Sequence, residues 1–175
     1  FQELLETVDE LKDTNIIFTK TNSDVDGKVI NQMINNYTKK NLEKSISVSS
    51  LGQLNYLSAL QYIDFIIGNS SSGLLEAPSF KIGTINIGDR QNGRIKAESV
   101  VDCLPNKKSI KRAIKIIYSN KFQNLLKNVK NPYLLENVKN PNGNLFTSQK
   151  IVKVLKTVKL DNILKKTFFD IKFSL

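Results

Sequence analysis

GNSSSGLLEAPSF, at residues 68–80, joins a short apolar run to a segment that can start a helix. The apolar run, FII at residues 65–67, has the length and the β-branched content of a buried strand. The residues between them are small, so the backbone can turn sharply and leave its amide N–H groups uncovered. A strand, a small-residue turn and a helix N-terminus together favour an anion site, because free N–H groups and the helix dipole point at the same place.

The side chains of this stretch are those that a nucleotide would need. The hydroxyls of Ser70, Ser71 and Ser72 can donate to phosphate oxygens, and the carboxylate of Glu76 can accept from vicinal hydroxyls. The stretch therefore predicts a diphosphate on the turn and a ribose on Glu76. It is neither a Walker A loop nor a G-x-G-x-x-G fingerprint. The alternative interpretation is that the serines only cap a helix of an ordinary α/β protein.

Apolar runs of strand length alternate with helical patterns over the first hundred residues. The predicted strands are residues 15–19, 45–49, 64–68, 84–88 and 98–103. The predicted helices are residues 1–13, 26–40 and a segment opened by a capping box at residues 50–53. Strands joined by helical crossovers form a parallel sheet that helices cover on both faces.

Beyond Pro105 the pattern becomes helical, with a loop rich in Asn and Pro at residues 128–144. The last clear helix is predicted at residues 147–159, with its apolar stripe facing inward: Ile151, Val152, Leu155 and Val158. Residues 1–159 are expected to form one nucleotide-binding domain. Residues 160–175 are too apolar for a free tail, and we expect them to pack on this domain or on a part of the protein outside the sequence.

Three polar loops follow predicted strands, at residues 22–27, 69–73 and 89–94. Ligands of parallel sheets bind at the carboxyl ends of the strands, so these loops are expected to converge on one crevice. Arg90 would add positive charge for phosphate there. Taken singly, Arg90 is equally typical of a surface arginine and Asn22 is more typical of a turn residue, and the convergence of the loops is what favours both as site residues.

The net charge of +10 is unevenly spread. Residues 1–105 carry 10 basic and 13 acidic side chains, whereas residues 106–175 carry 16 basic and 3 acidic ones. The lysines of the basic half alternate with apolar residues at helical spacing, which is typical of solvated helix faces. No zinc spacing or aromatic RNA-binding pattern accompanies them, so nucleic acid is not an expected partner.

The histidine and cysteine content of the chain excludes several kinds of site. The chain has no histidine, which excludes histidine acid–base catalysis and histidine metal ligands, and no metal is expected. The single Cys103 excludes an internal disulfide. No apolar run is long enough for a membrane span and no signal peptide is evident, so the expected location is the cytoplasm. The start at Phe1 suggests a piece of a longer protein.

Two stretches together, GNSSSGLLEAPSF at 68–80 and GTINIGDRQNGR at 83–94, closely resemble the UDP-N-acetylglucosamine 2-epimerase family. The resemblance extends from about residue 15 to residue 159 and is strongest to the hydrolysing branch used in sialic acid biosynthesis. It implies a GT-B fold, of which this chain is the C-terminal, Rossmann-like half.

The resemblance also implies roles for individual residues. Ser70 and Ser71, with the amides around Ser72 and Gly73, would hold the diphosphate, and Glu76 would bind the ribose hydroxyls. Three further residues would lie near the nucleotide: Asn22 near the phosphates, the Leu51 backbone at uracil, and Arg90 in the closed site.

The reaction implied is elimination of UDP from UDP-N-acetylglucosamine followed by addition of water, which releases N-acetylmannosamine. No redox cofactor is required. The acidic residues thought to move the C2 proton belong to an N-terminal domain that this chain lacks, so the isolated chain is expected to be inactive. Homo-oligomers are expected.

Several alternatives stay open. GT-B glycosyltransferases share the sheet and the ribose-binding glutamate, but the DRQ-x-GR pattern at 89–94 is one that we associate with the epimerases. A fragment of this kind could also act only as a nucleotide-sugar-binding module. The sequence leaves open UDP against GDP, and hydrolysis against simple epimerisation.

Overall fold

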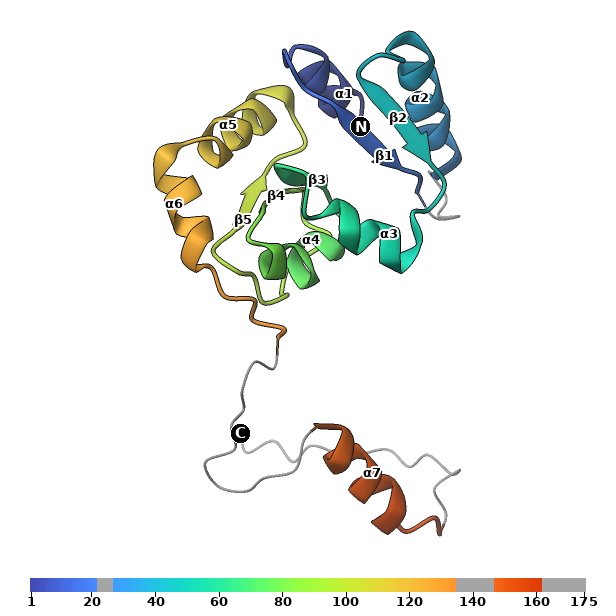
Figure 1. Ribbon diagram of the computed structural model, residues 1–175. Helices are drawn as coiled ribbons and strands as arrows, with labels where there is room; N and C mark the ends of the chain where they lie inside the picture. The colour runs from blue at the N-terminus through green and yellow to red at the C-terminus, as the bar shows by residue number, and fades with distance from the viewer. Residues whose placement is uncertain (22–26, 135–146, 162–175) are drawn as a thin grey trace, which may run out of the picture. The chain divides into compact units, whose positions relative to one another are not determined.

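The computed structural model describes residues 1–21, 27–134 and 147–161. The chain divides into two compact units, Phe1–Leu134 and Leu135–Leu175 (Figure 1). Within the described residues, no helix has the length and apolar character needed to cross a membrane.

The first unit alternates strands and helices as the sequence predicts. Its strands are β1 (Ile16–Thr19), β2 (Ser45–Val48), β3 (Phe65–Gly68), β4 (Gly83–Ile87) and β5 (Val100–Cys103). Its helices are α1 (Gln2–Asp9), α2 (Gly27–Lys40), α3 (Gly52–Ala59), α4 (Ser72–Leu75), the 3₁₀ helix η1 (Ala77–Phe80), α5 (Lys107–Ile117) and α6 (Asn120–Asn128). The predicted α/β class is confirmed.

All the strand pairs are parallel, but the strands form two sheets. One sheet pairs β1 with β2, and the other has the order β3-β4-β5, in which Phe65 lies opposite Gly83 and Thr84 opposite Val100. The predicted parallel arrangement is therefore divided between two sheets, because β1 and β3 share no hydrogen-bonded ladder. They share a hydrophobic core instead, in which Phe18 of β1 belongs to the same cluster as Ile85 of β4.

Helices cover both faces of the β3-β4-β5 sheet, as predicted. Phe65 and Ile67 pack in the cluster that contains Ile114 and Ile117 of α5. The intervening Ile66 packs in a second cluster, formed with Leu60, Ala77 and Ile82. Since successive side chains of a strand point to opposite faces, α5 and η1 lie on opposite sides of the sheet. Figure 1 shows α5 and α6 on one side of β4 and β5, and α3 and α4 on the other.

The start of α3 differs from the predicted capping box. The N-cap residue is Leu51 and makes no side-chain cap. Ser50 Oγ accepts a hydrogen bond of 3.1 Å from the N–H of Gly52, whose φ is +66°. Because the helix begins at Gly52, Ser50 lies one position too early to cap it.

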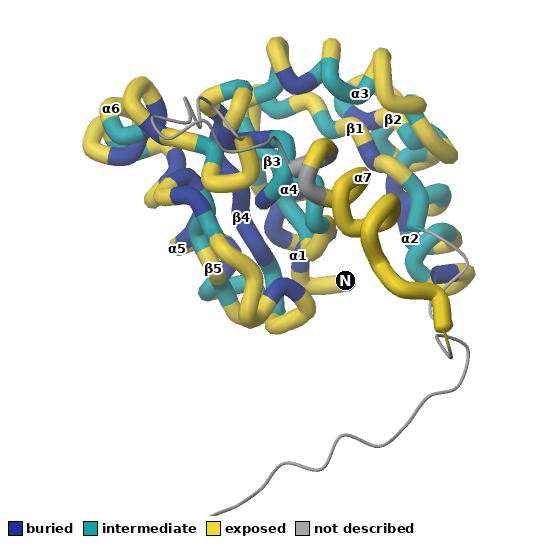
Figure 2. Tube along the Cα trace, turned by 90° about the horizontal axis from the view of Figure 1, so that it is seen from below, coloured by how far each residue is buried: buried dark blue, intermediate teal, exposed yellow. Residues whose placement is uncertain are grey.

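The second unit contains α7 (Thr147–Thr157). The residues predicted to face inward are exposed within this unit, and their packing against another part of the chain stays a prediction: Ile151, Val152, Leu155 and Val158 (Figure 2). The described part of this unit, residues 147–161, contains no second helix or strand on which that stripe could pack. The predicted tail lies outside the described residues except for its first two positions.

Candidate functional site

The serine turn begins where β3 ends. Gly68 is the last residue of the strand, and α4 starts at Ser72 with Ser71 as its N-cap. The helix is a single turn of four residues, which leads into η1. A single turn has a small dipole, so anion binding at this point would depend on free amides and hydroxyls more than on the predicted helix dipole.

Gly73 holds the turn tightly against β4. A Cβ atom at this position would lie 2.4 Å from Cγ2 of Thr84. The Thr84 hydroxyl donates a buried hydrogen bond of 2.8 Å to the Gly73 carbonyl oxygen. A side chain at position 73 would therefore have to displace Thr84, and the backbone of residue 73 is held by the neighbouring strand.

A second contact joins the serine turn to the loop after β4. Gln91 is buried, and its Nε2 donates a hydrogen bond of 2.7 Å to the carbonyl oxygen of Asn69. The predicted convergence is thus confirmed for the loops at 69–73 and 89–94. Asn22 and most of the loop at 22–27 lie outside the described residues.

Glu76 carries an unpaired buried oxygen. Its Oε2 is inaccessible to solvent and has no hydrogen-bond partner in the described part of the chain. A buried carboxylate oxygen without a donor is costly, so a water molecule or a ligand is expected to pair with it. A ligand with hydroxyl groups would supply that donor.

Tyr56 of α3 is a neighbour of this carboxylate that the sequence analysis did not select. Its hydroxyl is hydrogen-bonded to Ser72 Oγ. Burial, with a further contribution from the negative charge of Glu76, raises the pKa of Tyr56 to about 12. The sequence feature that could have indicated Tyr56 is its position next to apolar residues of α3 and its C-cap: Leu57 and Leu60 pack in the same hydrophobic cluster. A tyrosine in such a place buries its ring and needs a partner for its hydroxyl.

The other predicted site residues are more open. Ser70 is exposed, and its Oγ accepts a hydrogen bond of 3.3 Å from the Ser72 N–H. Ser71 and Leu51 are half-buried, and Arg90 is exposed. The structure thus groups Ser72 and Glu76 with Tyr56 and joins Asn69 to Gln91. Among the described residues, no hydrogen bond or ion pair joins Arg90 to the turn.

The segment after α6 is hydrogen-bonded to the helices of the site, α4 and η1. Nδ2 of Asn131 donates to the Leu75 carbonyl oxygen and to Ser79 Oγ, both at 2.7 Å. Lys81 Nζ donates to the carbonyl oxygen of Val129. Residues 129–131 therefore hold α4 and η1 in place, a role that the sequence alone did not indicate.

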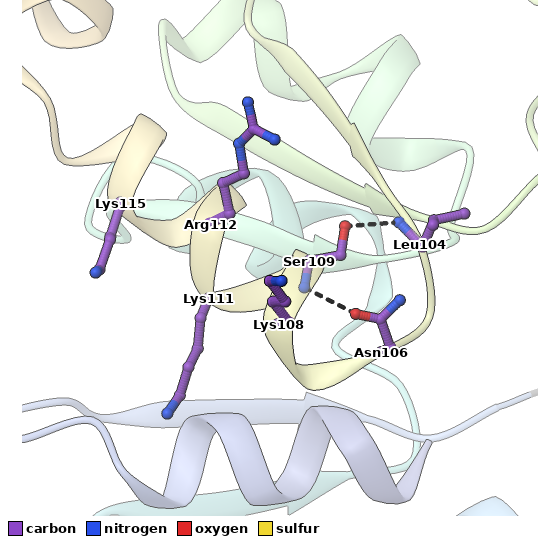
Figure 3. Close-up of a pocket in the computed structure, with 7 residues that line it drawn as sticks. All are labelled: Leu104, Asn106, Lys108, Ser109, Lys111, Arg112 and Lys115. Carbon is purple, nitrogen blue, oxygen red and sulfur yellow. Dashed lines mark hydrogen bonds between the residues drawn. The ribbon is translucent and has the colours of Figure 1, made fainter.

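A shallow pocket of about 540 Å³ lies along α5 (Figure 3). None of the predicted site residues lines it. Two of its backbone donors are already used, since Ser109 N–H is bonded to Asn106 Oδ1 at 2.9 Å and Leu104 N–H to Ser109 Oγ at 3.1 Å. Its Lys111 is paired with Glu10. The serine turn, with its unpaired Glu76 oxygen, is the better candidate for a ligand site.

Comparison with known proteins shows the family to which the chain is similar. Residues 1–156 match the family model described as UDP-N-acetylglucosamine 2-epimerase. The chain is 44% identical, over 96% of its length, to GDP/UDP-N,N'-diacetylbacillosamine 2-epimerase (hydrolyzing) of Campylobacter jejuni. It is 36% identical, over 97% of its length, to Polysialic acid biosynthesis protein P7 of Escherichia coli.

A UDP-N,N'-diacetylbacillosamine 2-epimerase (hydrolyzing) of Legionella pneumophila is 30% identical over 83% of the chain and 34% of its own length. The chain spans 41% of the length of each of the Campylobacter and Escherichia relatives.

Proposed function

Because the chain belongs to the UDP-N-acetylglucosamine 2-epimerase family, we propose that it is the nucleotide-binding part of a hydrolysing nucleotide-sugar 2-epimerase. The observation that carries the proposal is the serine turn, which follows β3 and is hydrogen-bonded to Thr84 of β4. The unpaired buried oxygen of Glu76 lies in the helical segment that follows the turn. The proposed substrate is UDP-N-acetylglucosamine, and the products are N-acetylmannosamine and UDP. The complete enzyme is expected to act in the cytoplasm as a homo-oligomer.

In the proposed complex, the diphosphate lies on the turn. The hydroxyls of Ser70 and Ser71 and the amides around Ser72 and Gly73 donate to its oxygens, with Arg90 and Asn22 as further donors. The backbone of Leu51 contacts the uracil base. This part of the chain would supply hydrogen-bond donors for a group that carries negative charge and would take no part in proton transfer to carbon.

Glu76 would bind the ribose. A carboxylate has two oxygens, and ribose offers two adjacent hydroxyl groups as donors. Binding would give the buried Oε2 the donor that it lacks in the described chain. The ligand would then remove a desolvation cost that the empty site carries, which favours binding.

The chemistry starts with elimination. A base outside this chain removes the C2 proton, the C1–O bond breaks, and UDP leaves with the bonding electron pair, which yields a 2-acetamidoglucal. Water then adds across the double bond with the opposite configuration at C2. The diphosphate gains negative charge as the C1–O bond breaks, so donors fixed on the turn stabilise that transition state.

A UDP-linked N,N'-diacetylbacillosamine is a second candidate substrate. The printed names of the Campylobacter and Legionella relatives favour it. The two candidates share the nucleotide and the diphosphate, so the same residues of this chain would bind both. Discrimination between the sugars would belong to residues that contact the sugar ring.

The proposal is tested by calorimetric titration of the chain with UDP and GDP, alongside Glu76→Gln. The exposed Glu98 supplies a matched control, Glu98→Gln. We expect saturable binding of UDP that Glu76→Gln weakens about tenfold or more, because a charged acceptor of two hydroxyls is lost, and that Glu98→Gln leaves unchanged.

No binding of either nucleotide by a folded sample would contradict the nucleotide-binding role. For the reaction itself, the complete protein is incubated with UDP-N-acetylglucosamine and followed by NMR. Free N-acetylmannosamine is expected. UDP-N-acetylmannosamine would indicate simple epimerisation, and transfer of the sugar to an acceptor would indicate a glycosyltransferase.

A further inference from the structure

Tyr56 joins α3 to the serine turn. The residue lies in the middle of α3 and is half-buried, and its hydroxyl is bonded to the hydroxyl of Ser72, the first residue of α4. The contact spans 16 residues of sequence, so it is a tertiary contact and not a local cap. The same α3 begins beside Leu51, where the base is expected.

Either hydroxyl can be the donor in this hydrogen bond, and Tyr56 can donate only while it keeps its hydrogen. Burial and the nearby Glu76 carboxylate raise the pKa of Tyr56 to about 12, so the phenol stays protonated at neutral pH. A protonated phenol donates one hydrogen bond, and a serine hydroxyl can accept while it donates its own hydrogen elsewhere.

We propose that Tyr56 is a positioning residue for the diphosphate: its hydroxyl donates to Ser72 Oγ, which leaves the Ser72 hydrogen free to donate to a phosphate oxygen. This inference rests on the proposed function, because it assumes a nucleotide diphosphate on the turn. The chain of donors runs from Tyr56 to Ser72 to phosphate, and each hydrogen bond in such a chain strengthens the next.

The arrangement makes a selective prediction. Tyr56 acts on the phosphate end of the nucleotide through Ser72, so loss of its hydroxyl should weaken UDP while uridine, which lacks phosphate, keeps its affinity. A purely structural role in holding α3 would weaken both ligands together, because α3 also lies beside the base position at Leu51.

The test compares Tyr56→Phe, Ser72→Ala and the double variant in the complete chain, with UDP measured by calorimetry and uridine by ligand-observed NMR. Tyr62 follows α3 and is 88% exposed, so Tyr62→Phe is the matched control. We expect Tyr56→Phe to weaken UDP about three- to tenfold, the range for one hydrogen bond, without changing uridine. The double variant should be no weaker than Ser72→Ala alone, because Tyr56 acts through Ser72.

Three results would overturn the inference. Wild-type affinity for UDP in Tyr56→Phe would show that the hydroxyl is not used. Equal loss of UDP and uridine would show a structural role only, and additive losses in the double variant would show that Tyr56 does not act through Ser72. If the wild-type chain binds neither ligand while its thermal unfolding is cooperative, the proposed function itself fails, and this inference fails with it.

Discussion

Gly73 shows most directly how a single residue fixes the serine turn. The space that a Cβ atom would occupy is already filled by the methyl group of Thr84, and the Thr84 hydroxyl is bonded to the Gly73 carbonyl oxygen. The turn therefore depends on the absence of a side chain at position 73 as much as on the serines that precede it.

Gly73→Ala is expected to lower the free energy of unfolding by about 1–3 kcal/mol, because the added methyl overlaps Thr84 at 2.4 Å. Urea denaturation measures this change. Thr84→Ser keeps the hydroxyl and removes the methyl group, so the double variant should recover part of the loss. If Gly73→Ala alone is as stable as the wild type, the packing described here is not present in solution.

Individual residues were predicted unevenly. Glu76 could be selected from the sequence because a carboxylate beside a serine turn suggests a ribose contact. Gln91 and Tyr56 could not, since their roles arise from contacts 22 and 16 residues away along the chain. Within the DRQ-x-GR pattern the sequence drew attention to Arg90, whereas the structure gives Gln91 the buried hydrogen bond to the turn.

Among the helices, α1 and α5 form an ion-pair cluster. Glu10, the C-cap residue of α1, lies 2.7 Å from Lys107 Nζ and is also paired with Lys111. The hydrogen bonds from these two lysines lower the pKa of Glu10 from 4.5 to about 2. Because Glu10 is exposed, solvent and salt screen this interaction, so its contribution to stability is small.

The pH dependence of stability should report this cluster. A carboxylate whose pKa is lowered on folding stabilises the protein above pH 4.5, and that contribution disappears as the pH falls from 4.5 towards 2. Thermal unfolding of wild type and Glu10→Gln should therefore differ at pH 6 and converge near pH 2, with Glu43→Gln as an exposed control. A constant difference between wild type and Glu10→Gln across that range would contradict the assignment.

The elements were predicted better than their arrangement. Strand and helix positions follow from local periodicity, so the predicted and observed bounds of β1 to β5 agree within about two residues. The separation of the strands into two sheets depends on which backbones pair across the chain, which periodicity does not encode. The apolar stripe of α7 stays a prediction for a related reason, since an amphipathic pattern shows which face is apolar but not which surface covers it.

At the scale of the whole molecule, the chain covers 41% of the length of the Campylobacter relative. The proposed nucleotide-binding role of this part rests on the hydroxyl groups of the serine turn and on Glu76, and the sequence contains no histidine. The described basic residues after Pro105 lie mostly on α5, α6 and α7. Several of them are already paired, as Lys107 and Lys111 are with Glu10.

The two separate sheets have a consequence for how the chain behaves at high concentration. Among the strands in the described residues, β4 alone has hydrogen-bonded neighbours on both sides, whereas β1, β2, β3 and β5 each have one edge without a strand partner. Unpaired edges are templates on which other chains can add strands, and Ile17 and Ile46, paired across β1 and β2, are both exposed beside such edges.

We therefore expect the chain alone to self-associate as its concentration rises, with an increase in the average sedimentation coefficient. Ile17→Thr combined with Ile46→Thr should reduce the effect by making the exposed surface of this sheet more polar. A sedimentation coefficient independent of concentration would contradict the expectation. If the chain does self-associate in this way, a segment that pairs with the open edges of β1 and β3 would protect it from aggregation. Such a segment would act as a chaperone for this chain.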